Sequence, residues 1–134
     1  MIKLKSLLLE NGGQKKRYSG IELDDKSHTL LKQKYPPQEG WEFIAHHMTI
    51  DPFKTLPEEE TGKEVKLKVT HVGKSDKASA VKVSGYDGKT NNKFPHVTLS
   101  VNRSGGGKPK DSNEITEWEP VQDDIYLTGT IKNL

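Results

Sequence analysis

Residues 64–72 carry the clearest alternation of apolar and polar positions in the chain. Apolar residues occupy every second position from Val65 to Val69, and lysines fill the positions between them. Successive side chains of a β-strand point to opposite faces, so this pattern predicts a strand with one buried and one exposed face. A turn over 73–77 and a second apolar-rich run over 78–84 complete a predicted β-hairpin.

Four further segments are rich in apolar, aromatic and β-branched residues and are bounded by Gly, Pro, Asn or Asp. This combination is typical of strands that end at turns. The sequence therefore predicts strands over 17–23, 44–50, 95–102 and 125–132.

One helix is expected after the first of these strands. The segment from Asp24 to Ser27 is suited to a helix start, and Leu30 and Leu31 follow on helical spacing. The Pro36-Pro37 pair ends the helix because proline cannot continue the backbone hydrogen bonds. The first unit is therefore a strand followed by a helix.

The remaining segments are shorter or more polar. Residues 1–10 could form a short helix or an edge strand, and residues 54–63 form a polar, acidic loop. A glycine-rich loop over 104–109 is followed by Asp111-Ser112-Asn113, which can cap a short helical stretch that reaches Trp118. We interpret Ser112 and Asn113 as caps rather than as ligand contacts.

These elements predict an α+β domain with more strand than helix. The length of 134 residues fits a single domain over 1–134, in which residues 1–16 could form a peripheral N-terminal extension. No linker divides the chain, and no repeat period of the solenoid type occurs.

Composition restricts the function. The formal net charge of +2 suits a small anionic ligand and is too small for a protein that coats duplex DNA. The absence of cysteine excludes disulfides, thiolate metal sites and a cysteine nucleophile. Leu7 to Leu9 is too short a run for a signal peptide, and no run approaches a membrane span. We therefore expect a cytoplasmic protein without a membrane partner.

One four-residue pattern occurs twice. His47-Met48-Thr49-Ile50 and His96-Val97-Thr98-Leu99 both read His, apolar, Thr, apolar, and each falls within a predicted strand. Positions i and i+2 of a strand point to the same face, so each histidine projects with its threonine. If the two strands are neighbours, both pairs face one groove.

This set of side chains suits phosphodiester cleavage. In-line attack on phosphorus needs a base for the nucleophile and an acid for the leaving oxygen, and histidine serves as either near neutral pH. Two hydroxyls can donate hydrogen bonds to the non-bridging oxygens. No metal or other cofactor is required, and the sequence holds no metal-ligand motif. A single His-x-Thr would be unremarkable, and coincidence remains the alternative interpretation.

With these paired motifs, the chain resembles the 2H phosphoesterase superfamily over roughly residues 17–132. The segment Lys108-Pro109-x-x-Ser112-Asn113 is most similar to the cyclic phosphodiesterase domain of fungal-type tRNA ligases. The resemblance implies a bilobal fold in which two antiparallel β-rich lobes with few helices surround a central cleft.

The resemblance also assigns roles. It implies that His47 and His96 are the catalytic acid/base pair and that Thr49 and Thr98 bind the substrate phosphate. Which histidine is the acid and which is the base stays open. Under this interpretation, the loop that holds Lys108 borders the cleft.

Several other residues could contribute. Tyr18 and Trp41 could stack on a base, and Arg103 and Lys108 could add positive charge for an anionic substrate. His46 is expected to point away from His47, because neighbours in a strand alternate, and we interpret it as a structural or surface residue. The histidines at positions 28 and 71 are expected on polar surfaces.

We therefore expect a monomeric phosphodiesterase that hydrolyses a 2′,3′-cyclic phosphate of a nucleotide or an RNA end. A close alternative is hydrolysis of cyclic nucleotide or cyclic oligonucleotide signals, of the viral counter-defence type, in which case the location is the host cytoplasm. Two alternatives come from other classes: a non-catalytic RNA- or nucleotide-binding module, and a structural β-rich interaction domain.

Overall fold

The computed structural model describes residues 16–134 as a β-rich fold with one α-helix and three short 3-10 helices among them. Helix α2 spans Asp25–Lys34, and the 3-10 helices are η1 (Glu58–Glu60), η2 (Arg103–Gly105) and η3 (Pro109–Glu114). The strands are β1 (Ser19–Leu23), β2 (Glu42–Phe43), β3 (His47–Asp51), β4 (Glu64–Lys74), β5 (Ala78–Ser84), β6 (His96–Val101), β7 (Trp118–Pro120) and β8 (Tyr126–Asn133).

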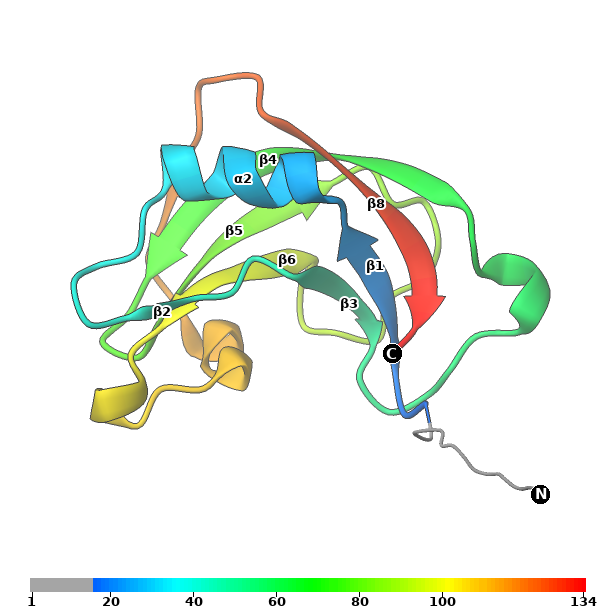
Figure 1. The fold of residues 1–134 in the computed structure, drawn as a ribbon, viewed down its shortest axis with the longest axis horizontal. Coiled ribbons are helices and arrows are strands. Elements are labelled where there is room, and N and C mark those ends of the chain that lie inside the picture. The colour runs from blue at the N-terminus through cyan, green and yellow to red at the C-terminus, as the bar shows by residue number, and fades with distance from the viewer. Residues whose placement is uncertain (1–15) are drawn as a thin grey trace.

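Six of these strands close into an antiparallel barrel (Figure 1). The order around the barrel is β6-β3-β1-β8-β4-β5, and the pairing of β5 with β6 completes the circle. The short strand β2 pairs with β6, and β7 pairs with β4. Closure leaves no free edge on the six barrel strands apart from the ends where they diverge.

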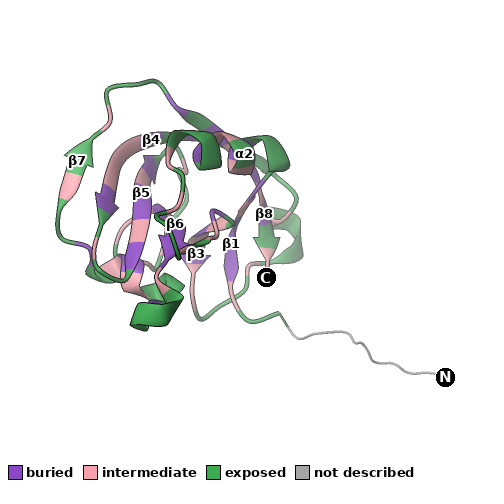
Figure 2. Cartoon of the chain, turned by 60° about the vertical axis from the view of Figure 1, so that its left-hand side comes forward, coloured by how far each residue is buried: buried purple, intermediate pink, exposed green. Residues whose placement is uncertain are grey.

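Alternation along the strands fills the barrel with apolar side chains. Met48 and Val97 are fully buried, as are Leu67, Val69 and Leu127 from the opposite wall. Figure 2 shows that buried residues concentrate on the strands, whereas α2 is mostly exposed. The predicted alternation over 64–72 is therefore confirmed.

Helix α2 begins and ends where the sequence predicts. The Asp24 carboxylate accepts a hydrogen bond of 2.8 Å from the backbone N–H of Ser27, which caps the first turn. Leu31 is fully buried in the core, and the Ser27 hydroxyl contacts Thr128 of β8. The helix is thereby fixed against the last strand.

The other predicted strands also form, with one shifted start. The strand expected over 44–50 begins only at His47, because Ala45 adopts a left-handed backbone conformation with φ of 42°. An alanine rarely adopts this conformation, since its Cβ crowds the backbone there. The distortion interrupts the strand just before the first His-x-Thr motif.

The sequence does not predict the short strands β2 and β7. The helical stretch expected to reach Trp118 ends at Glu114, and Trp118 begins β7. Two further expectations have different outcomes. The capping interpretation of Ser112 and Asn113 is wrong, since both residues lie inside η3, where the Asp111 carboxylate accepts from the backbone N–H of Lys108. The expected element over 1–10 falls outside the described residues.

Candidate active site

The two His-x-Thr motifs lie on neighbouring strands. Strand β3 pairs with β6, and Met48 is directly opposite Val97. Both of these side chains point into the barrel, so the residues that flank them point to its outer side. In an antiparallel pair this register sets His47 across from Thr98 and Thr49 across from His96.

All four side chains line one pocket of about 360 Å³ on this outer side. Its volume is at the lower end of the range for small-molecule sites. The predicted convergence of the two motifs is therefore seen in the structure. The pocket is lined by Tyr18, Ile44, His46, His47, Thr49, Pro52, Asn92, His96, Thr98, Pro109, Lys110 and Asn113.

His47 favours its neutral form. Burial lowers its pKa from 6.5 to about 4, and the neighbouring His46 and His96 contribute to the lowering, against a raising effect of the Glu22 carboxylate. At neutral pH the imidazole of His47 is therefore uncharged, which is the form that a general base needs.

The His96 ring is held by a hydrogen bond to the backbone just before its own strand. Its Nδ1 lies 2.9 Å from the carbonyl oxygen of Phe94, and a carbonyl only accepts, so Nδ1 carries the proton and Nε2 is left for the pocket. Burial lowers the pKa of His96, and the hydrogen bond to the Phe94 carbonyl opposes that change. The side chain is only 6% exposed.

The two threonines differ in their surroundings. The Thr98 hydroxyl lies 2.8 Å from the hydroxyl of the fully buried Ser112 and 3.3 Å from the carbonyl oxygen of Pro109, both in η3. The Thr98 hydroxyl donates its one proton to the Pro109 carbonyl, so Ser112 donates to Thr98, and Thr98 reaches a ligand by turning that proton away from Pro109. Within residues 16–134, the Thr49 hydroxyl makes no hydrogen bond and faces the pocket.

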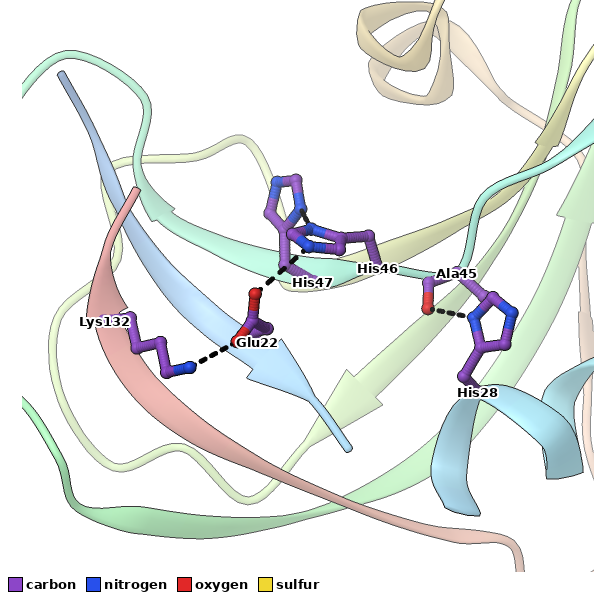
Figure 3. Close-up of polar contacts among 6 residues, drawn as sticks. All are labelled: Glu22, His28, Ala45, His46, His47 and Lys132. Atoms are coloured by element: carbon purple, nitrogen blue, oxygen red, sulfur yellow. Dashed lines mark hydrogen bonds and ion pairs between the residues drawn. The ribbon is translucent and has the colours of Figure 1, made fainter. Parts of the chain in front are cut away.

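His46 does not point away from His47, so that prediction is wrong. The two Nδ1 atoms are 2.8 Å apart, and the ring planes lie at 82° (Figure 3). His46 precedes the first residue of β3 and follows the left-handed Ala45, so strand alternation does not apply to it. The Ala45 carbonyl is itself contacted by His28 Nδ1 at 3.2 Å.

The remaining predicted site residues are distributed unevenly. The Tyr18 ring lines the pocket with its centroid 5.5 Å from that of His47. Trp41 lines a separate pocket of about 730 Å³ that also includes Tyr35 and Trp118. Arg103 forms an ion pair with Glu42 at 2.7 Å, and neither Arg103 nor the exposed Lys108 lines the histidine pocket.

Sequence reasoning missed three polar residues of the pocket: Asn92, Lys110 and Asn113. Lys110 brings the positive charge that had been expected from Lys108. The Asn113 Oδ1 is buried without a hydrogen-bond partner among the described residues, while its Nδ2 donates to the Lys110 carbonyl at 3.2 Å. Buried acceptors are normally satisfied, so this atom is an exception.

In comparisons with known proteins, no family model, curated protein or solved structure matches this chain. Among residues 16–134, no helix is long and apolar enough to cross a membrane. In the same part of the chain, no group of three or more His, Cys, Asp or Glu side chains is arranged to hold a metal ion.

Proposed function

We propose that the protein is a phosphodiesterase of the 2H type, which uses His47 and His96 as a general acid/base pair. One observation carries the proposal: two imidazoles and two threonine hydroxyls from neighbouring antiparallel strands line a single pocket. Around the Met48–Val97 pair, each imidazole lies across from a hydroxyl. The four groups thus have a local twofold arrangement, which would allow the two imidazoles to act on opposite sides of one phosphorus.

The chemistry needs only these groups and water. One imidazole removes a proton from water as the oxygen bonds to phosphorus. The other imidazole gives a proton to the ribose oxygen as the P–O bond breaks, and a phosphomonoester results. The hydroxyls of Thr49 and Thr98 donate to the non-bridging oxygens, where charge increases in the transition state.

The favoured substrate is a nucleoside 2′,3′-cyclic phosphate or an RNA end that carries one. The small pocket accommodates a phosphate and a ribose, Tyr18 offers a ring for stacking, and Lys110 offers positive charge. The absence of cofactors, a monomeric state and a cytoplasmic location belong to the same proposal.

The two-lobed arrangement of the 2H fold is also part of this proposal. Strand β3 with β1 and β8 would form one lobe, and β6 with β5 and β4 the other, with the His-x-Thr strands adjacent between them. The pairing of β8 with β4 would then join the two lobes on the side opposite the pocket.

The test is a hydrolysis assay with purified protein in EDTA. The substrates are the four nucleoside 2′,3′-cyclic phosphates, an RNA that ends in a cyclic phosphate, and a panel of cyclic dinucleotides. Turnover to a monoester, detected by chromatography and mass spectrometry, supports the proposal. Selective turnover of the cyclic dinucleotides favours the signal-hydrolase alternative, and tight binding without product favours a binding module.

Thr98→Val is expected to lower kcat by about 10²-fold, because the variant keeps the shape of the side chain but loses a donor to the phosphate. Steady-state kinetics on the preferred substrate measure the effect. Thr70→Val is the matched control, since Thr70 also donates to a backbone carbonyl, that of Lys82 at 3.3 Å, and does not line the pocket. An unchanged kcat in Thr98→Val would remove this hydroxyl from the mechanism.

A further inference from the structure

A chain of polar contacts leads from β8 through β1 to His47 (Figure 3). Lys132 forms an ion pair with the Oε1 of Glu22, and the Oε2 of Glu22 lies 3.2 Å from the Nε2 of His46. The Nδ1 of His46 is in turn 2.8 Å from the Nδ1 of His47. The register supports this chain, because Glu22 lies directly opposite both His47 and Thr130 on its two neighbouring strands.

When His46 is neutral, the chemistry of the atoms fixes the direction of each hydrogen bond. An ionised carboxylate only accepts, so the Nε2 of His46 donates to Glu22. A neutral His46 then has a lone pair on Nδ1, and the close contact requires the Nδ1–H of His47 to donate to it. The Nε2 of His47 is left with its lone pair, which is the form of a base.

Lys132 contributes to this state from the far end of the chain. Its hydrogen bond and charge lower the pKa of Glu22 and keep the carboxylate ionised. The other titratable groups around the two rings are His96 of β6, Lys110 of η3 and Tyr18 before β1, all of which line the pocket. Of these three groups and Glu22, all within the described residues, only Glu22 carries a negative charge near His46.

From these contacts we infer that Glu22 and His46 are positioning residues, which hold His47 as the general base and leave His96 as the general acid. The inference rests on the proposed function. The water proton moves to the Nε2 of His47, whose Nδ1–H remains donated to His46. Protonated His96 gives its Nε2 proton to the ribose oxygen, and exchange with solvent restores both rings.

The contrast with His96 supports the assignment. Its Nδ1–H donates to the Phe94 carbonyl, a bond that favours the protonated imidazole and raises the pKa of His96 against the effect of burial. Nothing in that contact prevents His96 from carrying a second proton on Nε2. The partner of His47 is instead the Nδ1 lone pair of His46, and the Glu22 carboxylate beyond His46 favours the charge that His47 gains when it takes a proton.

The first test does not depend on turnover. Nitrogen-15 NMR of the ligand-free protein at pH 7.5 reports the tautomer of His47. We expect the Nδ1–H form in the wild-type protein and a mixture in Glu22→Gln and His46→Ala. His46→Asn should retain more of the Nδ1–H form, because its amide oxygen can accept near the position of Nδ1. An Nε2–H tautomer in the wild type would overturn the inference.

The second test is kinetic. Glu22→Gln and His46→Ala should lower kcat about 10- to 100-fold with little change in KM. The acid limb of the rate profile should move to lower pH in Glu22→Gln, because the Glu22 carboxylate raises the pKa of His47, and to higher pH in His46→Ala, because His46 lowers it. Asp124→Asn, which removes a carboxylate paired with Lys68 at 3.4 Å, and His71→Asn are the matched controls. An unmoved pH profile in both variants would leave His46 and Glu22 with a structural role only.

The two tests separate the proposals. If the wild-type protein shows no turnover but has the fixed tautomer, the phosphodiesterase proposal fails and the positioning contacts stand. If turnover occurs and the tautomer of His47 in the variants is the same as in the wild type, only the inference about Glu22 and His46 fails. Near-ultraviolet circular dichroism confirms that each variant is folded; Glu22 and His46 are 30% and 49% exposed, so both substitutions fall near the surface.

Discussion

His47→Ala and His96→Ala are each expected to lower kcat by about 10²- to 10⁴-fold, the range of positioned acid/base groups. Each variant removes one proton-transfer group from the pocket but leaves the two threonine hydroxyls in place. The double variant should be only slightly slower than the worse single variant, because the two histidines act on one phosphorus as a unit. This non-additivity distinguishes a catalytic pair from two independent contributions.

Single-turnover and steady-state rates on a 2′,3′-cyclic phosphate measure the effect. His71→Ala is the matched control, since its imidazole also lies on a barrel strand, lies 3.0 Å from the hydroxyl of its neighbour Thr70 and does not line the pocket. Similar losses for His71→Ala would indicate a folding effect. Retention of full activity by His47→Ala or His96→Ala would contradict the mechanism outright.

The sequence was sufficient to predict the two central strands and the side to which their histidines project. Alternation alone placed Met48 and Val97 in the core and both His-x-Thr pairs on the other face. It could not establish that β3 and β6 are neighbours, because strand pairing at a separation of 49 residues depends on the closure of the whole barrel. The family resemblance, not the pattern, supplied that expectation.

The orientation of His46 could not be predicted from local pattern. It depends on the left-handed backbone of Ala45, and no glycine or asparagine marks that position. The conformation is imposed by tertiary contacts: the N–H of Ala45 donates to the Thr98 carbonyl, and the N–H of Leu23 donates to the carbonyl of His46. These contacts stabilise a backbone that alanine alone would avoid.

The residues that close the pocket from η3 were missed for a related reason. Ser112 and Asn113 have side chains suited to helix caps. The Ser112 hydroxyl instead forms a hydrogen bond with Thr98, which lies 14 residues earlier in the chain. Strands β2 and β7 have only two and three residues, so they exist through their partners rather than through propensity. Long-range packing therefore determines where the η3 residues of the site lie, while local alternation determines which side chains of β3 and β6 face the pocket.

The second large expected effect is a loss of stability in mild acid. Because the pKa of His47 is lowered in the folded protein from 6.5 to about 4, the folded state binds fewer protons than the unfolded state between these values. The stabilisation is complete above pH 6.5 and is lost as the pH falls towards 4. We expect His47 to account for about 2 to 3 kcal/mol of this loss, because each tenfold difference in proton affinity between the two states corresponds to about 1.4 kcal/mol. The lowered pKa of His96 acts in the same direction.

Urea unfolding at half-unit steps from about pH 7.5 to 4.0 measures this loss. The carboxylates of Glu22 and Asp24 have pKa values lowered from 4.5 and 3.8, so the change between pH 6.5 and 5 belongs to the histidines. His47→Gln should flatten the curve in that window, because glutamine is buried without a proton to gain. If the wild type and His47→Gln lose the same free energy of unfolding over this window, the His47 ring is not held neutral by the fold. Any hydrolysis would then have to use a general base whose pKa is not lowered by the fold.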